Sequence, residues 1–122
     1  MKKLILICFV LSGFVSNAQK SEVENTVITF FKAFHAKDTL ALKQLCHPDI
    51  VMRTIANTKE GNKLKDENFD DFLKSIATIP SNLKIFEKLI DYKIEIDGNL
   101  AHVWTPYEFY INDKLSHIGA NA

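Results

Sequence analysis

The sequence predicts an α+β domain, with helices near the N-terminus that pack against an antiparallel sheet from the second half of the chain. Three observations predict it. Residues 23–34 place valines and phenylalanines at helical spacing. Residues 92–96 alternate between apolar or aromatic and charged side chains, which is typical of a strand. A turn at Asp97-Gly98 then joins this strand to a long extended run, Leu100–Tyr110.

The first eighteen residues have the order of a signal peptide. Two lysines precede the apolar run Leu4–Val15, and Ser16–Ala18 matches the small-x-small rule for cleavage. The apolar run is too short to span a bilayer comfortably. We expect residues 1–18 to be removed, and residues 19–122 to be exported as one domain, to the periplasm or the medium, free of the membrane. The alternative is a buried N-terminal helix.

Composition argues against several function classes. Cleavage removes two of the fifteen basic residues, which leaves thirteen against fifteen acidic ones, and such a near-neutral domain gives no reason to expect nucleic acid or an anionic membrane as partner. Cys46 is the one mature cysteine, so no internal disulfide forms, and we interpret it as a small buried hydrophobe. The four histidines have no metal-binding spacing, and the chain has no glycine-rich phosphate loop. We therefore expect no metal and no cofactor.

The helices are predicted from their caps. Ser21 and Glu24 have the capping-box spacing, which predicts that a first helix begins at Ser21 and ends near Ala36. Asp38 caps a second, short helix that Pro48 ends. Either Asp66 or Asn68 caps a third helix that ends before Pro80. The inward residues of the second and third helices are predicted to be Ala41, Leu42 and Leu45, and Phe69, Phe72, Leu73 and Ile76.

The strands are predicted from their turns. Residues 50–55 form a strand, and a turn over residues 57–62 leads to a short strand at residues 63–65. Pro106 interrupts the long run, which implies either a bulge or a sheet edge there. A last strand begins at Leu115, after the turn at residues 112–114.

These residues resemble a known superfamily. The aromatic first helix, His47-Pro48-Asp49, the turn at residues 96–99, the run at residues 101–110 and Ser116-His117-Ile118-Gly119 are similar to nuclear-transport-factor-2-like proteins, in particular the SnoaL-like or lumazine-binding branch. The resemblance implies a cone-shaped, curved antiparallel sheet over N-terminal helices, as in cystatin-like folds, with a pocket between them. It also implies ligand binding or isomerase- and hydrolase-type activity, and dimers that form through the sheet.

One departure from the family concerns the C-terminus. Members of this superfamily continue beyond the Ser-His-x-Gly segment and add a final strand, whereas this chain stops at Ala122. The resemblance therefore implies a C-terminally truncated domain with an unpaired sheet edge, which favours association.

Glu108 and His117 are the candidate acid–base pair. If the loop before the last strand has two residues, odd residue numbers pair with even ones, which puts Glu108, Tyr110 and His117 on one face. A carboxylate and an imidazole on adjacent strands can orient each other and share a proton. The alternatives are an exposed polar face or a structural hydrogen bond.

The face that meets the pocket depends on Pro106. Without a bulge, Thr105, Tyr107 and Phe109 face inward, and a one-residue bulge at Pro106 turns Glu108 and Tyr110 inward instead. We expect the pocket to be lined by aromatic residues and one methionine, with core packing as the alternative for every aromatic: Phe31, Phe34, Met52, Trp104, Tyr107 and Tyr110.

Three functions remain open. The leading hypothesis is an exported protein that binds a small, partly apolar molecule. The second is an isomerase- or hydrolase-type enzyme that uses Glu108 or His117 for proton transfer. The third is an interaction module that forms a homodimer through its sheet face.

Overall fold

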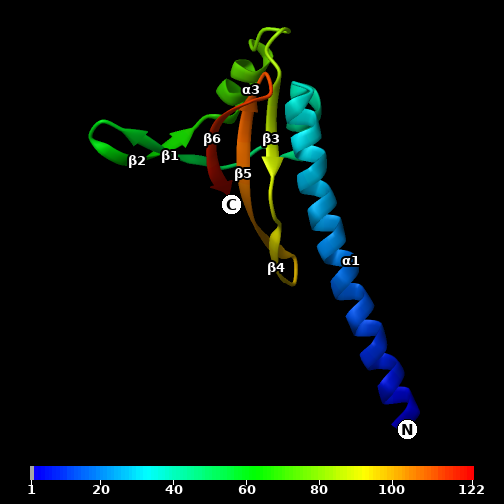
Figure 1. Cartoon of the computed structure of the whole chain (residues 1–122). Helices are drawn as coiled ribbons and strands as arrows, with labels where there is room; N and C mark the ends of the chain where they lie inside the picture. Colours follow the sequence, from blue (N-terminus) through cyan, green and yellow to red (C-terminus); the bar gives the residue numbers. More distant parts are fainter. Residues whose placement is uncertain (1) are drawn as a thin grey trace. The chain divides into compact units, whose positions relative to one another are not determined.

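The computed structural model describes the backbone of residues 2–122 and the side chains of residues 17–122. Helices and a hairpin come first along the chain, and a curved antiparallel sheet follows (Figure 1). The predicted α+β class is therefore confirmed. The chain forms two compact units. We call them the sheet unit, which comprises the chain up to Thr29 and Ile85–Ala122, and the helical unit, Phe30–Lys84.

The first helix, α1 (Lys2–His35), passes through Ser21 without a break. The prediction that a helix begins at Ser21 is therefore wrong for the full chain, because residues 17–20 contain no glycine or proline that would end a helix. Residues 1–16 of the predicted signal peptide lie outside the described side chains, so export stays a prediction. In the described part of the chain, no helix has the length and the apolar character that crossing a membrane requires.

The helical unit has a small aromatic core. Asp38 caps α2 (Thr39–Leu45) by accepting a hydrogen bond from the Ala41 N–H, and Asn68 caps α3 (Phe69–Ala77) in the same way. Leu42 is fully buried, whereas Leu45, predicted to face inward, is 37% exposed. The core contains residues from all three helices: Ala33, Leu42, Leu73 and Ile76, with Phe30, Phe34, Ala41, Phe69 and Phe72 packed against them.

Lys37 links the turn between α1 and α2 to the segment that follows α3. Its backbone has a φ of +57°, in the left-handed region that non-glycine residues seldom adopt. Its ammonium group donates hydrogen bonds of 2.8 Å to the carbonyl oxygens of Pro80 and Leu83. One side chain thereby satisfies two carbonyl groups of a segment that has no regular structure of its own.

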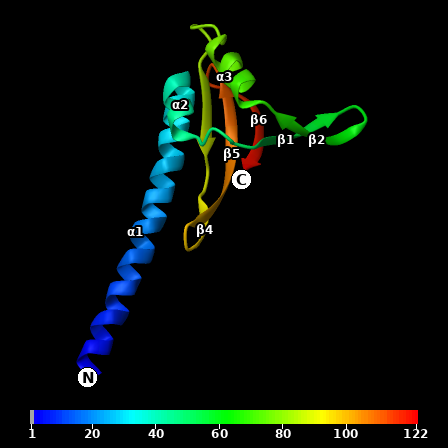
Figure 2. The same cartoon turned by 180° about the vertical axis from the view of Figure 1, so that it is seen from behind.

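The strands β1 (Met52–Thr58) and β2 (Gly61–Glu67) form an isolated hairpin that extends away from α3 (Figure 2). The predicted hairpin is confirmed with longer strands and a shorter loop. Ile55 pairs with Leu64, and both side chains are more than half exposed. Arg53 donates a hydrogen bond of 2.7 Å to Asp66 next to this pair.

The sheet unit is built around one strand. β5 (Leu100–Ile111) pairs with β4 (Lys93–Asp97) through its first half and with β3 (Ile85–Leu89) through its second half. On its other side it pairs with β6 (Lys114–Asn121). β3 and β4 follow one another along the same edge of β5 (Figures 1 and 2). Thr105, near the middle of β5, is only 2% exposed.

Pro106 does not cause a bulge, so the first of the two predicted alternatives is wrong. The strand continues through it, and the Pro106 carbonyl accepts a hydrogen bond of 2.8 Å from the Ile90 N–H. In an antiparallel strand, the nitrogen and carbonyl of a residue point to the same edge. The missing N–H of Pro106 therefore points to the place where β3 has ended and β4 has not begun, and the pair with Ile90 keeps one of its two hydrogen bonds.

The irregularity lies instead in β6. Asn112 and Asp113 form the expected two-residue turn, with φ values of +48° and +63°, and Ile111 pairs with Lys114 and Tyr110 with Leu115. The next pair is Phe109 with His117, so Ser116 is an extra residue in β6. Such a bulge moves every later side chain of the bulged strand to the other face.

The helical core gives the first prediction. Leu42→Ala should lower the free energy of unfolding of the full chain by about 2–5 kcal/mol, because it leaves a cavity under a fully buried side chain. Leu40→Ala in the same helix is the matched control, since Leu40 is 68% exposed and its loss should change stability by less than about 0.5 kcal/mol. Urea unfolding measures both, and equal losses would contradict the assigned core.

Candidate functional site

The two faces of the sheet carry different chemistry. We name them after residues of β5: the Thr105 face carries Tyr107 and Phe109 as well, and the Glu108 face carries Trp104, Pro106 and Tyr110. Cross-strand pairing extends each face to the neighbouring strands. The Thr105 face gathers titratable and aromatic side chains from three strands, and we call this group the sheet-face site: Glu87, Tyr107, Phe109, His117 and Asn121.

Glu87 joins the two outer strands of this site. It lies on β3, yet its Oε1 accepts a hydrogen bond of 2.6 Å from the Asn121 side chain on β6. β5 runs between these strands, so the bond crosses over β5. Burial raises the pKa of the Glu87 carboxyl, while the Asn121 hydrogen bond and the charge of His117 act in the opposite direction. Glu87 is therefore a candidate proton donor or acceptor.

His117 lies on an aromatic surface. Its imidazole ring stacks on Phe109 with centroids 4.9 Å apart, and it meets Tyr107 edge to face at 5.8 Å. The Ser116 hydroxyl lies 3.2 Å from its Nδ1. The imidazole is solvent-exposed, so one titratable ring is held in a fixed plane and stays accessible.

The position of the Tyr107 ring depends on Gly119. A Cβ atom at Gly119, its partner on β6, would lie 2.6 Å from the Tyr107 hydroxyl oxygen and 2.7 Å from Cζ. Only glycine therefore lets the phenol ring lie over β6, and any side chain at this position would push the ring away. Burial, followed by the nearby Glu87 charge, raises the pKa of the Tyr107 phenol.

The expected Glu108–His117 pair does not form. Without a bulge, the two-residue turn would have paired residue 108 with residue 117 and kept both on one face. The extra Ser116 pairs Glu108 with Ile118 and puts His117 opposite Phe109, on the other face. The prediction that Glu108, Tyr110 and His117 share one face is therefore wrong. On the face that carries His117, the carboxylate that interacts with the His117 charge is Glu87.

Glu108 has its own partners on its own face. Its Oε2 accepts a hydrogen bond of 2.6 Å from the Tyr110 hydroxyl, and the Lys88 ammonium lies 3.7 Å from the same oxygen. That hydrogen bond, followed by burial, raises the pKa of Tyr110. Around this group the Glu108 face is apolar and open to solvent, with four large side chains between 42% and 73% exposed: Phe86, Trp104, Leu115 and Ile118.

The six residues predicted to line a pocket fall in different places. Tyr107 belongs to the sheet-face site, while Trp104 and Tyr110 lie on the Glu108 face. Phe34 stacks on Phe72 with centroids 6.2 Å apart and is part of the helical core, so core packing accounts for it. Phe31, half-buried on α1, contacts Phe30 and Phe34, and Met52 is half-buried at the start of β1.

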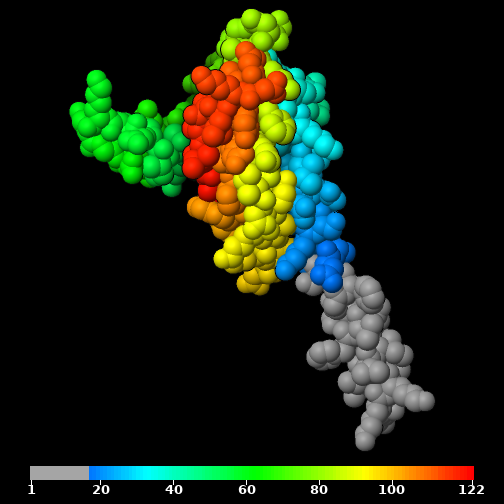
Figure 3. All heavy atoms as spheres, in the orientation of Figure 1, coloured from blue at the N-terminus to red at the C-terminus, as the bar shows by residue number. Residues whose placement is uncertain are grey.

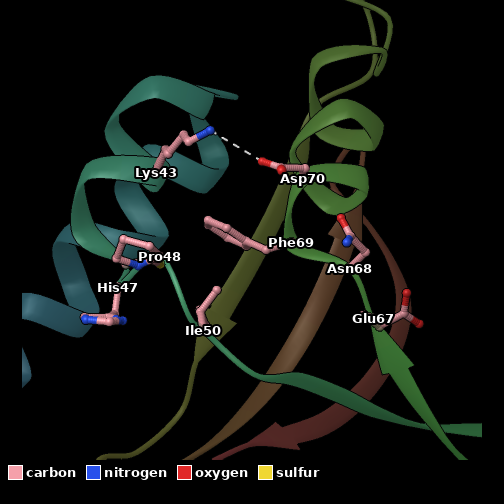
Figure 4. A pocket seen from close by; sticks show the side chains of 9 residues that line it. Lys43, His47, Pro48, Ile50, Glu67, Asn68, Phe69 and Asp70 are labelled. Atoms are coloured by element: carbon pink, nitrogen blue, oxygen red, sulfur yellow. Dashed lines mark hydrogen bonds and ion pairs between the residues drawn. The ribbon is translucent and has the colours of Figure 1, made fainter.

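The helical unit contains a cleft of about 410 Å³, within the usual size range of ligand pockets (Figure 4). It lies between the end of α2 and the start of α3, with the Phe69 ring pointing into it and the Lys43–Asp70 ion pair, 3.4 Å long, across its rim. Burial raises the pKa of the Cys46 thiol in its wall, so that the unreactive protonated form is favoured. The Lys43 and Asp70 charges at its rim are paired with each other, and its other polar lining residues are His47, Glu67 and Asn68.

Sequence reasoning missed two residues of the sheet-face site. Glu87 lies on β3, a five-residue strand with two charged residues that was not predicted at all. Asn121 comes one residue before the end of the chain, and its bond to a non-adjacent strand has no sequence signal. In the range with described side chains, no group of three His, Cys, Asp or Glu residues could hold a metal ion.

Comparisons of the chain with protein-family models, with curated proteins and with solved structures give no match.

The raised pKa of Glu87 predicts a pH-dependent stability. The protonated carboxyl is favoured in the fold, so its stabilising contribution is full below the ordinary glutamate pKa and is lost as the pH rises through the raised value. Glu87→Gln keeps the oxygen that accepts from Asn121 and cannot ionise. The variant should therefore gain stability over the native chain between acid and neutral pH, by at most about 1 kcal/mol, because solvent screens the half-exposed group.

Chemical unfolding of the native chain and of Glu87→Gln, each measured from pH 3 to 7, gives this difference in stability. The two proteins should have equal stability at the acid end. A difference that does not change with pH would show that burial does not penalise the Glu87 charge.

Proposed function

We propose that this chain is a nuclear-transport-factor-2-like protein that is exported and binds a small, partly apolar molecule at the sheet-face site. One observation carries the proposal: a carboxyl group with a raised pKa, an amide and an accessible imidazole lie together with two aromatic rings on one face of the sheet. Ligand sites in proteins combine mainly apolar surface with a few convergent polar groups in this way.

The chemistry of the site favours a flat ring with one polar substituent. The ring would lie against Tyr107 and the imidazole of His117, since aromatic pairs gain energy beyond their buried area. The substituent would meet Glu87 and Asn121. A carboxyl group that is protonated donates a hydrogen bond and one that is ionised accepts, so these two side chains offer both donors and acceptors.

Proton transfer is the second activity that we propose for this site, with Glu87 in the role first assigned to Glu108. It rests on the electrostatic interaction between Glu87 and His117, which links two titratable groups on one face. Binding is the first proposal because it requires the surface alone, whereas catalysis also requires a reacting atom held between the two groups.

The binding proposal is tested with benzoic acid, benzamide and phenol as probes in amide chemical-shift titrations of the full chain. Shifts should concentrate at residues 87, 107, 117 and 121. Tyr107→Ala, and Gly119→Ala through displacement of the Tyr107 ring, should each raise the dissociation constant about tenfold, which corresponds to about 1.4 kcal/mol. Glu108→Gln, on the opposite face, is the matched control and should leave binding unchanged. Shifts confined to the cleft at Phe69 would move the proposal to that site, and no shifts at all would remove it.

Homodimer formation through the Glu108 face is a separate proposal. The exposed Phe86, Trp104 and Ile118 side chains on this face support it, because apolar patches of this kind are typical of interaction surfaces. Trp104→Lys should then remove this contact and lower the mass that sedimentation measures, since a buried unpaired charge is costly. A native chain that sediments as a monomer at every concentration would contradict the proposal.

A further inference from the structure

The outer edge of β6 has free backbone hydrogen-bonding groups. In the described part of the chain, β6 pairs with β5 and with no other strand. The Ile90–Pro106 hydrogen bond shows that even-numbered residues of this part of β5 point their backbone groups to the β3 edge, so odd-numbered ones point to β6. Gly119, opposite Tyr107, is therefore bonded to β5, while the N–H and C=O groups of Ile118 and Ala120 point outward.

This edge lacks the features that usually protect an exposed strand. Beyond the Ser116 bulge it carries no lysine, arginine, aspartate, glutamate or proline, and Ile118 is 73% exposed. Figure 3 shows the atoms of β6, in red, along one border of the sheet in that view. Free backbone donors and acceptors at strand spacing are complementary to one kind of occupant, which is another extended strand.

We propose that β6 pairs antiparallel with β6 of a second copy of this chain, with the two-fold axis at Gly119. In this register, Ile118 of each copy pairs with Ala120 of the other, which satisfies all four outward groups of each strand segment. The two glycines meet at the axis, where strands approach most closely and a side chain would be crowded. Lys114, the one charged residue of β6, lies at opposite ends of the pair, whereas a parallel register would bring the two lysines together.

The same register extends the sheet-face site across the two copies. His117 and Asn121 both lie on the Thr105 face, and pairing about Gly119 puts each His117 directly opposite Asn121 of the second copy. The second copy would thus add an amide next to the accessible imidazole. This contact uses the strand edge, so it is distinct from association through the Glu108 face.

Sedimentation equilibrium of the full chain over a wide concentration range tests the pairing. We expect a mass that rises with concentration in the native chain and that still rises from monomer to dimer in Trp104→Lys, which removes association through the Glu108 face. Ala120→Pro removes an N–H that points away from β5, so the intramolecular sheet stays intact, and the dimer dissociation constant should rise at least about tenfold. Ala120→Ser keeps the N–H and is the matched control, expected to dimerise as the native chain does.

Amide hydrogen exchange supplies a second measurement that does not depend on a variant. The amides of Ile118 and Ala120 should exchange more slowly as the concentration rises, while the Gly119 amide, bonded to β5, should be slow throughout. A chain that stays monomeric, or Ile118 and Ala120 amides whose exchange is independent of concentration, would overturn the proposal. So would a dimer that survives Ala120→Pro and is lost in Trp104→Lys, because that result assigns the contact to the Glu108 face.

Discussion

The hydrogen bonds of β5 are the interaction on which the sheet unit depends. This strand pairs with β4 and then β3 along one edge and with β6 along the other, so each of the other strands is held in the sheet through it. The missing donor of Pro106 is tolerated because it points to the junction between β4 and β3. Thr105, next to this point, is 2% exposed and belongs to the few buried residues of the sheet unit's described side chains.

One extra residue decides which side chains can act together. Ser116 shifts the register of β6 by one position, and the period-two alternation of strands then exchanges its faces. His117 consequently stacks on Phe109, and Gly119 accommodates the Tyr107 ring. Glu108 has Lys88 and Tyr110 as partners on the other face. Two separate groups of titratable side chains result, one on each side of the sheet.

Local signals predicted most of the elements. The caps Asp38 and Asn68, the apolar face of α3 and the alternation of β4 are each encoded within a few residues, so sequence reasoning could find them. The start of α1 was missed because the capping motif at Ser21 competes with helix-compatible residues before it. The Glu87–Asn121 contact joins residues 34 positions apart. It depends on the curvature and register of the whole sheet, which no local pattern records.

The hydrogen bond between Glu87 and Asn121 closes a ring through β3, β5 and β6. This bond ties β3 to β6 over β5, although these two strands share no backbone ladder. The Asn121 hydrogen bond favours the ionised form of Glu87, because a charged acceptor makes the stronger hydrogen bond. The tie between the outer strands is therefore strongest when the Glu87 carboxyl is ionised.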